Sequence, residues 1–80
     1  MTDALKIDEE LDLQGEVCPY TFVKSKLALE EMESGQVLRV IITNSESADN
    51  VPRSLRSEGH TVLGVSKTGD QRWAILVKKA

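Results

Sequence analysis

The amino-acid sequence predicts an α/β (α+β) fold, a two-layer sandwich in which two helices cover one face of a four-stranded sheet. Three observations carry this prediction. Four short segments have the composition of strands, two longer segments have the periodicity of helices, and their order along the chain is β-α-β-α-β-β. A chain of 80 residues provides one such domain with a modest core. We expect residues 1–8 to form a flexible N-terminal tail and residues 9–80 to form the domain.

The first strand is predicted at residues 10–14, where apolar and polar residues alternate strictly. Residues 15–18 follow as a turn, in which Gly15 permits the sharp change of direction. Residues 19–34 contain good helix formers, and Gly35 is the residue type expected just past a helix end. We therefore expect a strand, a short turn and a helix in immediate succession.

Apolar residues lie on two flanks of the helix predicted at residues 19–34. The stripe expected to pack on the sheet consists of Phe22, Ser25, Ala28, Leu29 and Met32. Val23 and Leu27 do not join that stripe, and they form an i,i+4 pair on a different flank. The pair is either buried against a neighbouring helix or the N-terminal tail, or it is an exposed apolar spot that receives a partner protein.

Residues 36–43 form the strongest predicted strand, because they are nearly continuous in β-branched and aliphatic residues. We expect this strand to be central and parallel to the first one, with the helix as a right-handed crossover. The polar cluster at residues 44–47 can cap a second helix, which Gly59 ends. Pro52 leaves two interpretations. Either the regular helix begins near it, or a longer helix from Ser45 has a defect there, which we favour.

Residues 61–66 and 72–77 are predicted strands, and residues 67–71 between them have the composition of a hairpin turn. With this hairpin the β-α-β-α-β-β order is complete. The side chains of the second and fourth strands that we expect to face the helices are Leu38, Val40, Ile42, Trp73, Ile75 and Val77.

The chain has a single cysteine, Cys18, which directly precedes Pro19 at the predicted junction between the first strand and the first helix. Proline is favoured at the first position of a helix, so Cys18 is expected at the N-cap. A sulfur there faces unpaired backbone N–H groups and the positive end of the helix dipole, which favour the reactive thiolate. The alternative is that Cys18 is merely a small apolar cap. Ser, Thr, Asp and Asn cap helices better than cysteine does, which favours a chemical role.

Composition and cysteine usage exclude several classes of function. A lone cysteine supports neither an internal disulfide nor a dithiol redox cycle, and a reducing cytoplasm is its simplest setting. The only histidine, His60, is expected at a strand edge on the surface, and the sequence has neither metal-ligand spacing nor a nucleotide-binding glycine motif. A net charge of −3 and 4% aromatic residues disfavour nucleic acid, and no segment is long enough to span a membrane. We expect no cofactor and no metal, and an isolated activated thiol suits a sulfur carrier.

Five features of the sequence carry a resemblance to a known family. They are Leu11-Asp12-Leu13-Gln14-Gly15-Glu16-Val17-Cys18-Pro19, the predicted helix ending near Gly35, Asp49-Asn50-Val51-Pro52, Glu58-Gly59-His60 and the terminal aliphatic strand with Lys78-Lys79. With these features the sequence resembles the TusA/SirA sulfur-carrier family. The resemblance covers residues 10–79 and implies a mixed sheet of strand order 1-2-4-3, with the fourth strand antiparallel to the others. It also implies that Cys18 carries persulfide sulfur from a cysteine desulfurase or rhodanese-like donor to an acceptor protein, such as a DsrE-like protein. Members of the family serve tRNA thiolation, molybdenum-cofactor supply or dissimilatory sulfur metabolism.

By its place in the motif, Cys18 matches the family's sulfur-bearing residue, and Pro19 matches the first proline of its Cys-Pro-x-Pro sequence. Thr21 stands where the second proline is usual, and we expect its N–H or hydroxyl group to hydrogen-bond a thiolate or persulfide. The residues expected to meet partner proteins are Tyr20, Val23, Lys24, Lys26 and Leu27. The two lysines have a second interpretation, as part of a solvated helix face. Residues 43–45 depart from the family's frequent Asp-Asp-Pro, which implies a client other than the one that tRNA-thiolation members serve.

Two functions from different classes therefore compete. The first is a sulfur carrier, whose status as an enzyme of the sulfurtransferase type is open because the protein itself is consumed and regenerated. The second is a non-enzymatic interaction or regulatory module in which Cys18 takes part in no sulfur chemistry.

Overall fold

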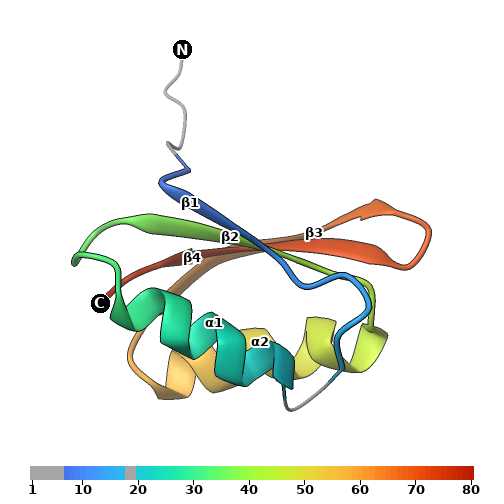
Figure 1. Cartoon of the computed structure of the whole chain (residues 1–80), viewed down its shortest axis with the longest axis horizontal. Coiled ribbons are helices and arrows are strands. Elements are labelled where there is room, and N and C mark those ends of the chain that lie inside the picture. The colour runs from blue at the N-terminus through green and yellow to red at the C-terminus, as the bar shows by residue number, and fades with distance from the viewer. Residues whose placement is uncertain (1–6, 18–19) are drawn as a thin grey trace.

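The structure is a computed structural model that describes residues 7–17 and 20–80 (Figure 1). Its elements are β1 (Glu9–Asp12), α1 (Tyr20–Glu30), β2 (Val37–Ile42), α2 (Ser45–Ser57), β3 (Thr61–Gly69) and β4 (Arg72–Lys78). Both helices lie on one side of the sheet, and the other side carries no second layer (Figure 1). The predicted fold class, a two-layer sandwich, is confirmed.

The four strands form one mixed sheet in the order β1-β2-β4-β3. β1 pairs with β2 in parallel, whereas β4 is antiparallel to both β2 and β3. This confirms the strand order and the antiparallel fourth strand that the family resemblance implies. A row of paired residues crosses all four strands and consists of Leu11, Val40, Ile75 and Val65.

Pairing along β1 begins before the strand itself. The N–H of Asp8 donates to the carbonyl of Val37 at 2.9 Å, and the carboxylate of Asp8 accepts from the N–H of Val37 at 2.8 Å. Residue 8 is therefore tied to β2 by two hydrogen bonds. Residues 1–6 of the expected tail lie outside the described part of the chain.

The core lies between the sheet and the two helices. Its fully buried apolar side chains are Leu29, Leu38, Val40, Ile42, Val51, Leu55, Ile75 and Val77. The strand faces that were expected to point toward the helices are confirmed, although Trp73 is only half-buried. The stripe predicted on α1 is confirmed as well, with buried Ser25, Leu29 and Met32 and partly buried Phe22 and Ala28.

The first helix is shorter than the sequence predicts, because α1 ends at Glu30 rather than near residue 34. Gly35 does not end the helix. It lies in a separate turn, with a φ of +91°, where the N–H of Gln36 donates to the carbonyl of Glu33 at 3.0 Å. The cause is the sheet, since the N–H of Gly35 donates to the carbonyl of Lys79 and Lys79 donates back to Gln36. Pairing with the end of β4 thus draws the chain out of the helix.

The longer version of the second helix is confirmed, because α2 runs from Ser45 to Ser57 through Pro52. Asn44 caps it, and its side-chain oxygen accepts from the N–H of Ser47 at 3.0 Å. This bond satisfies one of the N–H groups that have no partner inside a helix. Pro52 is buried within the helix, and it has no N–H to donate to the preceding turn.

The predicted stop of this helix at Gly59 is confirmed. Gly59 has a φ of +97°, and its N–H donates to the carbonyl of Arg56 at 3.0 Å. The next N–H, that of His60, donates to the carbonyl of Leu55 at 3.1 Å. These two bonds form the Schellman motif, which requires the left-handed conformation that glycine adopts without strain.

The hairpin between β3 and β4 is tighter than the sequence predicts. β3 extends to Gly69 and β4 begins at Arg72, so the connection is Asp70-Gln71 rather than residues 67–71. Lys67 is a strand residue paired with Trp73, and its ammonium group lies 5.7 Å from the centre of the indole ring. The polar composition that suggested a long loop belongs to solvent-exposed ends of two paired strands.

His60 joins the end of α2 to the C-terminal segment. It is half-buried, and its Nδ1 accepts a hydrogen bond from the N–H of Ala80 at 3.1 Å. Desolvation by burial lowers the pKa of His60 below its usual 6.5, Lys79 lowers it further, and Glu58 acts in the opposite direction. The neutral imidazole is therefore the form that the fold favours, and only that form can accept the bond from Ala80.

We expect the stability of the protein to fall as the pH drops below about 6.5, because the unfolded chain then binds a proton on His60 that the folded chain resists. In His60→Asn the side-chain oxygen can still accept from Ala80 but does not titrate. Urea unfolding at about pH 7.5 and about pH 5 should show a smaller loss of unfolding free energy in the variant than in the wild type. Equal losses of unfolding free energy in the two proteins would contradict the assignment of this pH dependence to His60.

Candidate functional site

The loop that follows β1 is anchored to the end of β2. The N–H of Leu13, which is buried, donates to the carbonyl of Ile41 at 2.8 Å. The N–H of Gly15 donates to the hydroxyl oxygen of Thr43 at 2.9 Å. Gly15 has a φ of +86°, as the sharp turn predicted at this residue requires. Because β1 and β2 are parallel, their C-terminal ends lie at the same end of the sheet, and the loop leaves from that end.

The first turn of α1 follows directly. The N–H groups of Tyr20 and Thr21 both donate to the carbonyl of Val17, at 2.9 Å and 3.3 Å, so these two groups are paired with the backbone, whereas unpaired N–H groups were expected to face the sulfur. The predicted N-cap position of Cys18 and helix-start position of Pro19 fall on residues that lie outside the described part of the chain. The residues on either side reach the surface, since Val17 is 49% exposed and Tyr20 is 60% exposed.

Thr21 is fully buried and points away from solvent. Its hydroxyl group lies 2.9 Å from the hydroxyl of Ser47, which is also fully buried. Its carbonyl accepts a hydrogen bond from the hydroxyl of Ser25 at 2.7 Å. The first turn of α1 is thereby attached to the first turn of α2. The expected bond from Thr21 to the sulfur concerns Cys18 and stays a prediction.

Ser47 is a residue near the site that the sequence analysis missed, because it was interpreted only as part of a capping cluster. A signal was present in its spacing. Ser47, Val51 and Leu55 are separated by four residues each, so they share one face of α2, and all three are fully buried. The i, i+3, i+7 spacing of Ala48, Val51 and Leu55 predicts a stripe that begins one residue later, but Ala48 is only partly buried.

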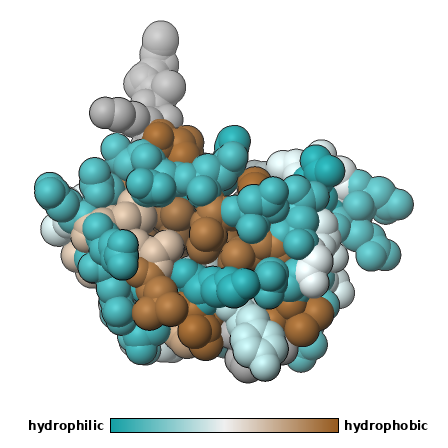
Figure 2. All heavy atoms as spheres, in the orientation of Figure 1, coloured by the Kyte–Doolittle hydropathy of each residue, from teal (hydrophilic) through white to brown (hydrophobic). Residues whose placement is uncertain are grey.

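The solvent side of α1 and the preceding loop carries four large apolar side chains. Their exposed fractions are 49% for Val17, 60% for Tyr20, 44% for Val23 and 55% for Leu27. These four residues form what we call the exposed apolar strip. Val23 and Leu27 are therefore exposed rather than buried against a neighbouring helix, and their role in receiving a partner protein stays a prediction. Figure 2 shows hydrophobic side chains at the surface, among hydrophilic ones, on the face where α1 lies.

The two lysines predicted to meet partners both form ion pairs in the structure. Lys24 lies 3.0 Å from the carboxylate of Glu16, and Lys26 lies 3.4 Å from that of Glu58. All four side chains are more than a third exposed. Pairs of this kind contribute about 0–1 kcal/mol, so a partner protein can replace them at little cost. Positive and negative charge balance along both sides of the exposed apolar strip.

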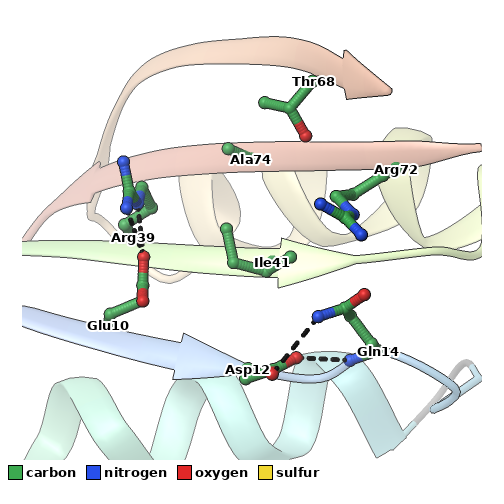
Figure 3. A pocket seen from close by; sticks show the side chains of 8 residues that line it. All are labelled: Glu10, Asp12, Gln14, Arg39, Ile41, Thr68, Arg72 and Ala74. Carbon is green, nitrogen blue, oxygen red and sulfur yellow. Dashed lines mark hydrogen bonds and ion pairs between the residues drawn. The ribbon is translucent and has the colours of Figure 1, made fainter. Parts of the chain in front are cut away.

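A shallow hollow lies on the opposite face of the sheet, which the helices do not cover (Figure 3). Its lining residues are Glu10, Asp12, Gln14, Arg39, Ile41, Thr68, Arg72 and Ala74. Arg39 donates to Glu10 at 2.6 Å, and the amide groups of Gln14 donate to Asp12 at 3.0 Å and 3.3 Å. The lining contains neither a thiol nor an imidazole, so this hollow offers no sulfur nucleophile.

Other candidate ligands and catalytic partners lie apart from the loop. Within residues 7–17 and 20–80, no three His, Cys, Asp or Glu side chains are grouped so as to hold a metal ion. His60 lies between α2 and β3. The start of β3 is at the end of the sheet opposite to the one where residues 13–17 follow β1 (Figure 1). Neither helix in this described part is long and apolar enough to cross a membrane.

Comparison with known proteins gives consistent matches. The family model described as Sulfurtransferase TusA matches residues 9–79. A protein of Archaeoglobus fulgidus is 53% identical over 75 residues, which are 94% of this chain and 85% of that protein. A Thermotoga maritima protein is 36% identical over 91% of this chain and 92% of its own length. TsuB of Escherichia coli is 33% identical over 90% of this chain and 96% of its own. Each of the three bears the name "Putative sulfur carrier protein".

A solved structure has the same fold. The crystal structure of a SirA-like protein from Desulfitobacterium hafniense superposes with a TM-score of 0.77 and covers 88% of this chain and 95% of its own. At 24% sequence identity, this likeness concerns the fold. It agrees with the strand order of the sheet described above.

The contrast between the two sides of α1 predicts unequal effects of two leucine substitutions. Leu29→Ala removes a fully buried side chain and should lower the free energy of unfolding by about 2–5 kcal/mol. Leu27→Ala alters a side chain that is 55% exposed, and its effect should stay within about 0.5 kcal/mol. Urea unfolding of both variants measures the difference. A large loss in Leu27→Ala would mean that this side chain is covered.

Proposed function

The chain belongs to the TusA family, and on that basis we propose that it carries sulfur between proteins as a persulfide on Cys18. The observation that carries the proposal is the family match over residues 9–79, which includes the only cysteine of the chain. The exposed residues next to Cys18 support it, because a carrier must present its sulfur to other proteins.

The proposed cycle has two steps of sulfur exchange. The thiolate of Cys18 attacks the outer sulfur of a persulfide on the donor, and the donor's cysteine sulfur leaves with the electrons of the broken S–S bond. An acceptor thiolate then attacks the outer sulfur of the Cys18 persulfide. The outer sulfur stays on the acceptor, and the Sγ of Cys18 leaves as a thiolate. Each step forms one S–S bond and breaks one, so neither consumes an oxidant or a reductant. The cycle also needs no cofactor.

The start of a helix suits this chemistry. The helix dipole favours an anion there, and a cysteine of lowered pKa is largely thiolate at neutral pH and also leaves readily. In the proposed site, Pro19 fixes the start of the helix. Thr21 supports the sulfur through hydrogen bonding, and Tyr20 lines the approach to it.

We assign the docking of partners to the exposed apolar strip, with Lys24 and Lys26 beside it. Val23 and Leu27 supply exposed apolar area, and they follow Cys18 by five and nine residues, or about 1.4 and 2.5 helical turns. The donor in this proposal is a cysteine desulfurase or a rhodanese-like protein, and a DsrE-like protein is a suitable acceptor. The setting is the cytoplasm, where a single thiol stays reduced.

Loading with sulfur tests the central claim. After incubation with a cysteine desulfurase and cysteine, the intact mass of the wild-type protein should rise by one sulfur atom and return to its starting value on treatment with a reducing thiol. Cys18→Ser is the control and should show no gain. If neither a desulfurase nor a rhodanese-like donor adds sulfur to the wild type, the protein is an interaction module instead.

Docking on the exposed apolar strip predicts a separate effect on transfer. The double variant Val23→Ser and Leu27→Gln should slow sulfur transfer from the protein donor about 10-fold or more, as loss of interface anchors worth about 1–2 kcal/mol would. Its reaction with a small-molecule persulfide should be unchanged.

Leu63→Gln provides a matched control, because Leu63 is also an exposed leucine, at 39%, but lies on β3. It should transfer sulfur at the wild-type rate. Equal rates in the strip variant and the wild type would contradict the assignment of the docking surface.

A further inference from the structure

The buried polar side chains of this protein gather at one place. Among the described residues, the buried polar ones are Thr21, Ser25 and Ser47, each with none of its surface exposed. The hydroxyl groups of Thr21 and Ser47 lie 2.9 Å apart, and Ser25 donates to the carbonyl of Thr21 at 2.7 Å. All three thus meet at the first turn of α1, three residues after Cys18.

Stability alone does not account for a buried pair of hydroxyl groups. Burying a hydroxyl is costly unless it is hydrogen-bonded, and apolar side chains of similar shape are about as stable in such a position. A bonded pair instead imposes a distance and a direction, which apolar contacts do not. Here the pair fixes the first turn of α1 against the first turn of α2.

The other side of the cysteine is tied to the same part of the chain. The N–H of Gly15 donates to the hydroxyl oxygen of Thr43 at 2.9 Å. Asn44 follows Thr43 and accepts from the N–H of Ser47 at 3.0 Å, which orients the first turn of α2. Residues 43–47 therefore hold the chain both upstream of Cys18, at Gly15, and downstream of it, at Thr21.

We propose that Thr43 and Ser47 are positioning residues of the sulfur site, which clamp the Cys18 segment from both ends and keep Cys18 reactive as a thiolate. The clamp includes residues 43–45, where the sequence departs from the family's frequent Asp-Asp-Pro, and Thr21, where it departs from the second proline. This inference deepens the proposed function, because it concerns the same sulfur. It requires no contact between either positioning residue and the sulfur.

The clamp acts by preorganisation. The positive end of the α1 dipole favours an anion only if the anion keeps a fixed position relative to the helix. Loss of either tie lets the segment between Gly15 and Thr21 move relative to the helix axis. The pKa of Cys18 should then rise toward the value of about 8.5 that an ordinary cysteine has.

The rate of alkylation by iodoacetamide as a function of pH measures that pKa directly. Ser47→Ala and Thr43→Val should each slow alkylation at pH values below the pKa by about 3- to 10-fold, which corresponds to a pKa rise of about 0.5 to 1. Thr43→Ser keeps the hydroxyl group and should react like the wild type.

Val51→Ala is the matched control for loss of packing. Val51 lies one turn beyond Ser47 on the same face of α2 and is fully buried, but it has no hydroxyl group. This variant should lower the free energy of unfolding and leave the alkylation profile of Cys18 unchanged. If Val51→Ala shifts the profile as much as Ser47→Ala does, general loosening explains the effect and the clamp is refuted.

Unchanged alkylation profiles in both Ser47→Ala and Thr43→Val would also overturn the proposal, whatever their stability. Thr43 is only half-buried, so Thr43→Val remains a usable test if Ser47→Ala does not fold. Alkylation needs no sulfur donor. A failure of the clamp is therefore distinguishable from a failure of persulfide loading, which the mass measurement detects on its own.

Discussion

The parallel pairing of β1 with β2 is the constraint on which the rest of the structure depends. Two antiparallel strands can be joined by a turn of two residues, but parallel strands need a connection that crosses back over the sheet. Here α1 is that connection, and its N-terminal end must lie at the end of the sheet where β1 stops. The C-terminal end of β2 and the start of α2 lie at the same end of the sheet. A strand of only four residues, Glu9–Asp12, thus brings the segments on either side of Cys18 next to residues 43–47.

The distribution of side chains around α1 follows from this position. The helix presents hydroxyl groups to the core at Thr21 and Ser25, and it presents apolar groups to solvent at Val23 and Leu27. An ordinary surface helix has the opposite arrangement. Leu29 anchors α1 to a core that is supplied mainly by β2, β4 and α2, with Leu13 from the loop after β1 and Met32 from the segment after α1. The outer face of α1 is therefore available for contacts with other proteins.

Much of the fold could be predicted from the sequence, because local pattern and tertiary contact agree there. The alternation in β1, the continuous apolar run in β2 and the Gly59 stop each reflect the structure that forms. Prediction failed where a distant segment decides the local conformation. Gly35 has the chemistry of a helix end, but pairing with Lys79 ends α1 earlier, and no local pattern records that contact. The polar residues after Ser66 suggested a loop because an exposed strand end and a loop have similar composition.

At the site, too, the features set by neighbouring residues could be predicted, and those set by distant contacts could not. The motif around Cys18 could be recognised from neighbouring residues alone, and so could the separate flank formed by Val23 and Leu27. Whether that flank is covered depends on the rest of the molecule, so the sequence left two interpretations. Ser47 was missed because a serine near a helix start is usually a cap. Its partner Thr21 lies 26 residues away along the chain.

The exposed apolar strip has a kinetic consequence for the carrier proposed above. In that proposal donor and acceptor dock on the same few side chains, so each excludes the other. Each round of delivery then includes a complete release, and a very tight complex with either protein would reduce throughput. The modest size of the strip suits brief encounters, in which the carrier exchanges one client for the next.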